Sequence, residues 1–293
     1  MDDRPHSAAY FGPERDFWWN LDHLELLATR RGLHSVRSVL DVGSGIGHWG
    51  MLLGRVLDAE VVGVEREPQW VAEAKRRAQE LGLPCRYVEG VAEALPFDDG
   101  SFDLVTCQTV LIHVSDPLAV IREMLRVTRP GGQVVVAEPN NRASSVVAHE
   151  DPRDVLDFVV TCERGKIALG EGNNSVGDYV PGYFAQAGLV DIDVWLADKP
   201  EVLFPPYAAP GQRERAEAAR REAATGWGGW TPEQARRYFE AGGGIRFEDA
   251  WARRMAEARA IAAAIDAGTY HTAGGTLLYL VAGRRAGAQR ELG

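Results

Sequence analysis

The 293-residue chain lacks the residue patterns of a metal-binding, disulfide-linked or membrane protein. Its three cysteines are scattered and form no CxxC pair, which argues against a disulfide framework and fits a reducing cytoplasm. No metal-ligand spacing such as HExxH occurs, so no metal site is predicted. No apolar run approaches the ~20 residues of a membrane-spanning helix, and the first residues show no signal-peptide pattern. We therefore expect a cytoplasmic protein without a membrane partner.

Basic residues are fewer than acidic ones: the chain has 32 Lys and Arg residues and 42 Asp and Glu residues, which gives a formal net charge of -10. This balance argues against a nucleic-acid backbone or an anionic membrane as the main partner. The hydrophobic share of 45% and the charged share of 25% are ordinary for a soluble globular protein. The length allows one large domain, or one domain with a sizeable insertion.

The most informative segment that is present is SVLDVGSGIGHWG, residues 38–50. Its apolar start predicts a buried strand, and the apolar residues after it predict a helix. Between them stand three glycines at two-residue spacing: Gly43, Gly45 and Gly47. A strand, a tight glycine turn and a helix bring bare backbone, and a helix N-terminus, close to a ligand. The dinucleotide pattern GxGxxG would need glycine at His48, and a phosphate-binding P-loop would need Lys followed by Ser or Thr.

Strand and helix patterns alternate along much of the chain. Strands are predicted at 59–65, 85–89, 102–108, 133–138, 189–196 and 274–282, and helices at 14–31, 68–81, 116–128 and 179–187. This alternation predicts an α/β fold, a parallel sheet covered by helices. Ligands of such sheets bind beyond the carboxyl ends of the strands, where Glu65, Gln108 and His113 are expected. Glu65, about 20 residues after the glycines, suits a ribose because a carboxylate accepts hydrogen bonds from two hydroxyls.

The segment VLDVGSGIG, and LRVTRPGGQVVVAE at 125–138, resemble motifs of the class I S-adenosylmethionine-dependent methyltransferases. The resemblance runs in order to about residue 140 and returns near the C-terminus. It implies a Rossmann-like, mostly parallel sheet of seven strands, with an antiparallel last strand between the fifth and sixth. It also implies S-adenosylmethionine as cofactor, S-adenosylhomocysteine as product and a small-molecule substrate.

The resemblance implies a set of cofactor-binding residues. They are Asp41, Gly43, Ser44, Gly45, Gly47, Glu65, Arg66, Ala92, Glu93, Gln108, Tyr10 and Arg15. Many relatives carry Asp, which accepts from the adenine amino group, where this chain has Val91. The N–H of Ala92 can still serve the ring, while Glu93 or a backbone carbonyl takes the amino group, or that group faces water. The aromatic N-terminal segment either anchors the first helix or folds over the ligands, so that Tyr10 and Arg15 reach the cofactor carboxylate.

His113 is the predicted general base, because it follows the fourth strand and imidazole titrates near neutral pH. The alternative is a histidine that packs against the next helix. Weaker candidates for substrate contact are Glu138, Tyr179, Tyr183 and His271. A base is optional, since a sulfonium already provides a good leaving group. The Pro-Pro-Tyr at 205–207 lies far from the fourth strand and is predicted as a turn.

The expected organisation has an N-terminal arm and helix at 1–32 and a Rossmann-like domain at 33–198 and 273–283. Mainly helical insertions at 141–175 and 199–272 are expected to form either a substrate cap or an oligomer interface, as in a homodimer. The leading hypothesis is a small-molecule methyltransferase acting on an O, N or C atom. The alternatives are a non-methylating enzyme on the same fold, such as a cyclase, or a non-catalytic protein that binds an adenosyl ligand.

Overall fold

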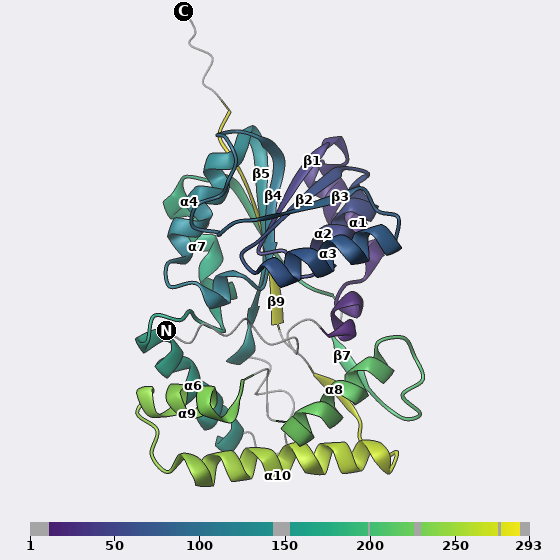
Figure 1. Ribbon diagram of the computed structural model, residues 1–293, viewed down its shortest axis with the longest axis vertical. Helices are drawn as coiled ribbons and strands as arrows, with labels where there is room; N and C mark the ends of the chain where they lie inside the picture. Colours follow the sequence, from purple (N-terminus) through teal and green to yellow (C-terminus); the bar gives the residue numbers. More distant parts are fainter. Residues whose placement is uncertain (1–11, 143–152, 199, 226–229, 275–276, 288–293) are drawn as a thin grey trace, which may run out of the picture. The chain divides into compact units, whose positions relative to one another are not determined.

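The computed structural model describes residues 12–142, 153–198, 200–225, 230–274 and 277–287 (Figure 1). The chain divides into two compact units. The sheet unit comprises Asn20–Pro139, Val176–Ala197 and Leu278–Gly293. The helical unit comprises Met1–Trp19, Asn140–Ser175 and Asp198–Leu277. Among the described residues, no helix combines the length and apolar character that crossing a membrane requires.

The sheet unit contains one seven-stranded sheet in the order β3-β2-β1-β4-β5-β9-β6 (Figure 1). Its strands are β1 Ser38–Val42, β2 Glu60–Glu65, β3 Cys85–Glu89, β4 Phe102–Gln108, β5 Thr128–Asn140, β6 Val190–Leu196 and β9 Leu277–Arg284. Strand β1 pairs in parallel with β2 and β4, whereas β9 pairs antiparallel with β6. The predicted α/β fold is confirmed, including an antiparallel last strand between the fifth and the sixth.

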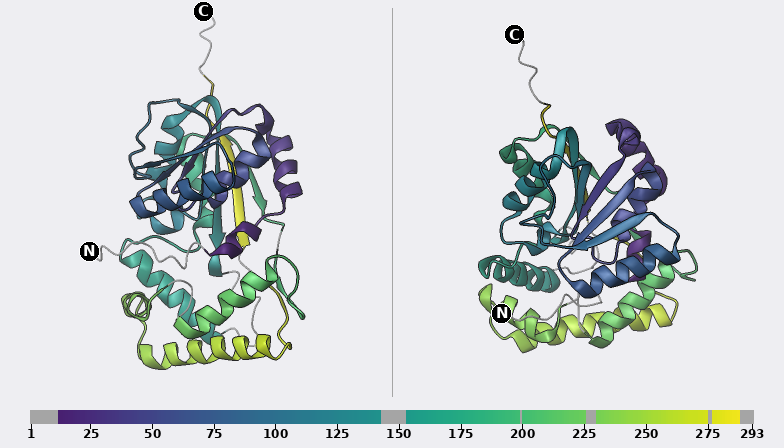
Figure 2. Two further views of the ribbon diagram at one scale, coloured as in Figure 1. Left: turned by 45° about the vertical axis from the view of Figure 1, so that its right-hand side comes forward. Right: turned by 45° about the horizontal axis from the view of Figure 1, so that its top comes forward.

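Helices cover both faces of this sheet, with α1, α2 and α3 on one face and α4 and α7 on the other (Figures 1 and 2). Their bounds are α1 Leu21–Arg31, α2 His48–Leu57, α3 Pro68–Glu80, α4 Pro117–Val127 and α7 Val180–Ala187. Short 3-10 turns are η3 Leu33–Ser35, η4 Leu111–His113 and η5 Val176–Tyr179. Helix α4 starts as predicted, because the Asp116 carboxylate accepts a hydrogen bond from the Ala119 N–H at 2.9 Å.

The core of the sheet unit consists of the apolar strand residues. All seven residues of β4 are buried, as expected for a central parallel strand covered on both faces. Cys107 in this strand is fully buried, and burial raises the pKa of its thiol well above the usual value. It therefore serves as a small apolar side chain.

The predicted single helix over 14–31 is wrong. The chain forms a short 3-10 turn, η2 Pro13–Phe17, and α1 starts only at Leu21. Between them Asn20 has an extended backbone, with φ -83° and ψ 128°, which interrupts the helix. The break also places η2 in the helical unit and α1 in the sheet unit.

The helical unit is built from four helices and a two-stranded ribbon among its described residues. The helices are α6 Arg153–Ala168, α8 Gln212–Thr225, α9 Pro232–Ala241 and α10 Phe247–Asp266, and the ribbon pairs β7 Glu201–Leu203 with β8 Thr272–Gly274. Helix α9 was not predicted. Its signal was the capping box at its start, where the Thr231 side chain accepts from the Gln234 N–H and the Gln234 side chain accepts from the Thr231 N–H.

Aromatic packing holds the helical unit together. Phe158 of α6 stacks on Phe239 of α9 with ring centroids 5.4 Å apart, and Phe247 stacks on Trp251 within α10 at 5.6 Å. Helices α6 and α9 approach so closely that a Cβ on Gly165 would lie 1.7 Å from the Tyr238 carbonyl oxygen. Two apolar residues of α10, Ala258 and Ile265, are buried, with exposures of 5% and 2%.

Candidate functional site

The glycine turn, residues 43–47, links β1 to α2. Gly43, Gly45 and Gly47 have φ values of +64°, +52° and +89°, a region that residues with a side chain rarely adopt. The Ser44 N–H donates to the Val64 carbonyl at 2.9 Å, and the Gly47 N–H donates to the Ser44 carbonyl at 2.8 Å. Three positive φ values in five residues explain the glycine spacing in the sequence.

Two of these glycines are also required by space. A Cβ on Gly43 would lie 2.5 Å from the nearest methyl carbon of Val110, which follows β4. A Cβ on Gly47 would lie 2.4 Å from the Tyr87 hydroxyl of β3. The turn is therefore packed directly against neighbouring parts of the sheet unit.

Glu65 at the end of β2 is fixed by the turn. Its Oε2 accepts a hydrogen bond from the Gly45 N–H at 3.0 Å, and its Oε1 accepts from the Glu67 N–H at 3.0 Å. Each carboxylate oxygen has two acceptor positions, so both can accept a further hydrogen bond. The carboxylate is thus held in one orientation at the end of the strand, which fits the binding of two neighbouring hydroxyls.

Asp41 lies at the base of α2. It is 1% exposed, and its Oδ2 accepts from the Gly50 N–H at 2.9 Å. Burial raises the pKa of this carboxyl from 3.8 to about 8; the Gly50 hydrogen bond opposes the shift and the charge of Glu65 adds to it. The structure therefore shows Asp41 supporting the helix that follows the turn.

Ser44 lies between Gly43 and Gly45 in the turn. Its hydroxyl is buried, and within the described part of the chain it has no hydrogen-bond partner. Burying a hydroxyl without a partner costs free energy, so a bound group or a water that completes the hydrogen bond is favoured. The turn conformation, the carboxylate of Glu65 and the Ser44 hydroxyl together fit an adenosyl cofactor.

Glu138 of β5, expected to contact substrate, is fully buried. Its Oε1 accepts from the N–H groups of Val110 and Leu111 at 2.7 and 2.8 Å. These contacts fix the chain just after β4, where Thr109 has a φ of +55°. The same segment continues to His113, which is half-buried at the end of η4 and donates its N–H to the Val110 carbonyl at 2.9 Å. Glu138 thus positions the segment that carries the predicted base.

Other predicted residues of the sheet unit lie at strand ends or in loops. Gln108 is buried at the end of β4, and Arg66 is exposed beside Glu67, with 3.4 Å between Nε and Oε1. In the segment after β3, Ala92 is half-buried and Glu93 is exposed. Val91, which stands where relatives have Asp, is 44% exposed.

The tyrosines and the helical-unit candidates are placed differently. Tyr179 is 51% exposed, whereas Tyr183 is half-buried against the core, and burial raises the pKa of its hydroxyl, with Tyr179 and Asp116 adding to the shift. Arg15 and His271 belong to the helical unit; the Arg15 guanidinium lies 4.5 Å from the Trp18 ring centroid. Tyr10 lies outside the described residues.

Sequence reasoning missed two pairs of residues. Tyr87 and Val110 pack on the glycines of the turn, and Glu123 and Arg126 of α4 bind the segment after β3. The two packing residues carry no sequence signal beyond being apolar or aromatic. The i, i+3 spacing of opposite charges on a helix was a signal, but only for contact within that helix. A search of the described residues for metal-binding groups of three or more His, Cys, Asp and Glu finds none.

These features define a Rossmann-like protein whose glycine turn and Glu65 lie at the ends of neighbouring strands. Comparison with known proteins agrees: residues 40–136 match a family model described as a methyltransferase domain. Over 103 residues the chain is 40% identical to demethylmenaquinone methyltransferase from Thermus thermophilus, covering 35% of this chain and 47% of that protein. Over 203 residues it is 29% identical to ubiquinone biosynthesis O-methyltransferase from Xanthomonas euvesicatoria, covering 65% and 80%.

A solved structure supports the fold. The cyclase SpnF superposes with a TM-score of 0.53 and 22% identity, covering 91% of this chain and 82% of that one. The chain spans about half the length of the demethylmenaquinone methyltransferase that it matches. The matched domain and the two relatives confirm the predicted resemblance to the class I S-adenosylmethionine-dependent methyltransferases.

Proposed function

We propose that the protein transfers a methyl group from S-adenosylmethionine to an O, N or C atom of a small molecule. The observation that carries this proposal is the glycine turn with Glu65, whose two oxygens are oriented by the N–H groups of Gly45 and Glu67. This arrangement suits a ribose with two hydroxyls next to a backbone turn. The match to a methyltransferase domain and the similarity to an O-methyltransferase support methyl transfer over other uses of the site.

Each residue has a stated task in this proposal. Glu65 accepts hydrogen bonds from the ribose hydroxyls. The Ser44 hydroxyl forms a hydrogen bond with the ligand, and the Ala92 N–H donates to the adenine ring. The cofactor supplies a methyl group on a positively charged sulfur, which leaves readily. His113 removes a proton from the acceptor where the acceptor needs it, and Gln108 lines the site from the end of β4.

The relatives suggest which acceptors to test first. Their names place one in menaquinone methylation and the other in O-methylation during ubiquinone biosynthesis. We therefore propose a small molecule of a biosynthetic pathway as substrate, with phenolic and quinone-like rings at the head of the panel. Tyr179 and Tyr183 are the proposed substrate contacts of the sheet unit, and His271 that of the helical unit.

The helical unit is proposed to form a substrate cap. An insertion of this length between strands of the sheet is typical of functional segments. The alternative is an oligomer interface on α10, to which the apolar residues Ala258 and Ile265 would contribute little because they are buried. We propose a cytoplasmic location and small-molecule partners, with no nucleic acid. Analytical ultracentrifugation would distinguish a monomer from a homodimer.

The experiment is incubation of the protein with trideuteromethyl S-adenosylmethionine and the acceptor panel, followed by mass spectrometry. A methyltransferase gives a product that carries one trideuteromethyl group and an equal amount of S-adenosylhomocysteine. A cyclase would give an unlabelled isomer with no consumption of the cofactor. For an acceptor that needs deprotonation, His113→Asn should lower kcat by about 10²-fold and leave the cofactor Kd unchanged; an unchanged kcat would remove His113 from this role.

A further inference from the structure

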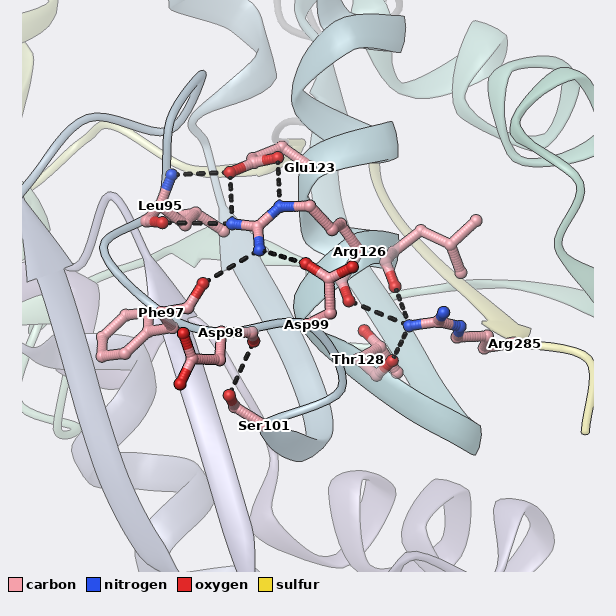
Figure 3. Close-up of polar contacts among 10 residues, drawn as sticks. Leu95, Phe97, Asp98, Asp99, Ser101, Glu123, Arg126, Thr128 and Arg285 are labelled. Carbon is pink, nitrogen blue, oxygen red and sulfur yellow. Dashed lines mark hydrogen bonds and ion pairs between the residues drawn. The ribbon is translucent and has the colours of Figure 1, made fainter. Parts of the chain in front are cut away.

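The β3–β4 loop, residues 90–101, has little regular structure of its own. Its first part contains one isolated bridge, in which the Ala94 N–H donates to the Val91 carbonyl at 3.2 Å. Two side chains of the neighbouring helix α4, Arg126 and Glu123, hold the part that follows (Figure 3). The loop is therefore held by contacts from about 30 residues further along the chain.

Arg126 makes the larger number of these contacts (Figure 3). Its Nη1 donates to the Phe97 carbonyl at 2.9 Å and to the Asp99 carboxylate at 2.6 Å. Its Nη2 donates to the Leu95 carbonyl at 3.1 Å. A planar guanidinium can serve three separate acceptors in fixed directions, which a lysine ammonium on a flexible stem does less well.

Glu123 fixes the guanidinium and contacts the loop as well. Its two oxygens accept from Arg126 Nη2 at 2.7 Å and Nε at 2.8 Å, a bidentate pair. One of the same oxygens accepts from the Leu95 N–H at 2.8 Å. Both backbone groups of Leu95 are thus bound by this pair, and the Leu95 side chain is 4% exposed.

Leu95 follows the bridge between Val91 and Ala94, so its position sets that of Ala92. In the proposed function the Ala92 N–H donates to the adenine ring, and Val91 provides no acid for the amino group. Recognition of the base then depends on backbone atoms, whose position depends on Leu95. We infer that Arg126 and Glu123 are positioning residues for adenine recognition, although neither contacts the ligand; this inference rests on the proposed function.

The test is calorimetric titration of the full chain with S-adenosylhomocysteine and with S-inosylhomocysteine. The two ligands differ only at the ring edge, where the inosyl ring carries a proton on N1 in place of an acceptor and a carbonyl oxygen in place of the amino group. The measured quantity is the Kd of the inosyl ligand divided by the Kd of the adenosyl ligand. The wild-type protein should prefer the adenosyl ligand, and Arg126→Ala should weaken its binding by about tenfold and the inosyl ligand's binding by less, so that the ratio falls.

Arg285→Ala is the matched control. Arg285 Nη1 donates to the carbonyls of Leu125, Arg126 and Thr128 at the end of α4 (Figure 3). Within the described residues it approaches the loop only through the Arg126 carbonyl, which also accepts from the Gly100 N–H at 2.9 Å, far from Leu95 in the loop sequence. Its removal should affect stability but leave the ratio of Kd values unchanged. Arg126→Lys and Glu123→Gln test the same point with smaller changes, and both should reduce the ratio less than Arg126→Ala.

Each outcome decides one of the two proposals. No binding of S-adenosylhomocysteine by the wild-type protein would contradict the proposed function itself. Binding without preference for the adenosyl ligand, or an unchanged ratio in the Arg126 and Glu123 variants, would overturn the positioning role alone. If Arg126→Ala does not fold, the lysine and glutamine variants give the same comparison.

Discussion

The glycine turn and the β3–β4 loop are both expected to contact the cofactor, but the fold holds them in different ways. The turn takes its shape from backbone conformation, with three glycines at positive φ and Glu65 bound to the Gly45 N–H. The loop takes its shape from side chains of α4, chiefly the Arg126 guanidinium.

This difference determines how each segment responds to change. The turn is determined within one strand–turn–helix segment, and an added methyl group meets atoms that are already packed. The loop depends on a charged pair that is partly exposed, with side-chain exposures of 32% for Arg126 and 17% for Glu123. We therefore expect the turn to respond mainly to sterics and the loop mainly to charge and pH.

The largest effect is expected from Gly47→Ala. Its φ of +89° is strained for alanine, and its Cβ would lie 2.4 Å from the Tyr87 hydroxyl. The free energy of unfolding should fall by about 2–4 kcal/mol. The control is Gly82→Ala, with φ +63° but nothing within 4 Å, which should cost about 1 kcal/mol. Urea unfolding measures both, and equal losses would mean that packing against Tyr87 does not matter.

Glu65→Ala sharpens the comparison at the ligand. Removing a charged hydrogen-bond acceptor costs about 1.5–3 kcal/mol, so the Kd for S-adenosylhomocysteine should rise about tenfold or more. Glu67→Ala is the control, since it keeps the backbone N–H that Glu65 binds and removes only a side chain paired with Arg66. Calorimetry of the two variants settles the matter: an unchanged Kd in Glu65→Ala would remove this residue from the site.

Asp41→Asn tests the buried acid beneath the turn by its pH dependence. Because the folded-state pKa of about 8 lies above the unfolded value of 3.8, the folded protein binds the extra proton between these values. Asp41 thus contributes stability below pH about 4, and this contribution is lost as the pH rises through 8, by about 1.4 kcal/mol per pH unit. Asparagine should remove that slope in unfolding experiments from pH 5 to 8; identical slopes would argue against a protonated Asp41.

Glu123→Gln is expected to give the smallest effect, and the pH dependence that it removes is opposite in sign to that of Asp41. The hydrogen bond from Arg126 lowers the pKa of Glu123, so its contribution is present above the usual value of 4.5 and is lost as the pH falls below it. The pair is partly exposed, and its worth should not exceed about 1 kcal/mol. Acid titration of stability should show this loss in the wild type and not in Glu123→Gln.

The sheet and the turn could be predicted because their signals are local. Buried parallel strands appear as short apolar runs, and positive φ values require glycine at Gly43, Gly45 and Gly47. The predicted helix over 14–31 failed because one extended residue, Asn20, breaks it without a proline or glycine in the sequence.

The remaining parts depend on distant contacts. A carboxylate at a strand end can face a ligand or the interior, and only the packing of α2 and of the segment after β4 shows that Asp41 and Glu138 are buried. The hold of Arg126 on Leu95 likewise depends on where α4 packs against the sheet, 31 residues away. Sequence patterns report which residues are present, but not these orientations.

The most direct test of the account is calorimetric titration of the purified protein with S-adenosylhomocysteine and, separately, with NAD. The glycine turn and Glu65 predict binding of the adenosyl ligand in the micromolar range and no binding of NAD. Binding of NAD alone, or of neither ligand, would contradict the assignment of this turn to an S-adenosylmethionine site.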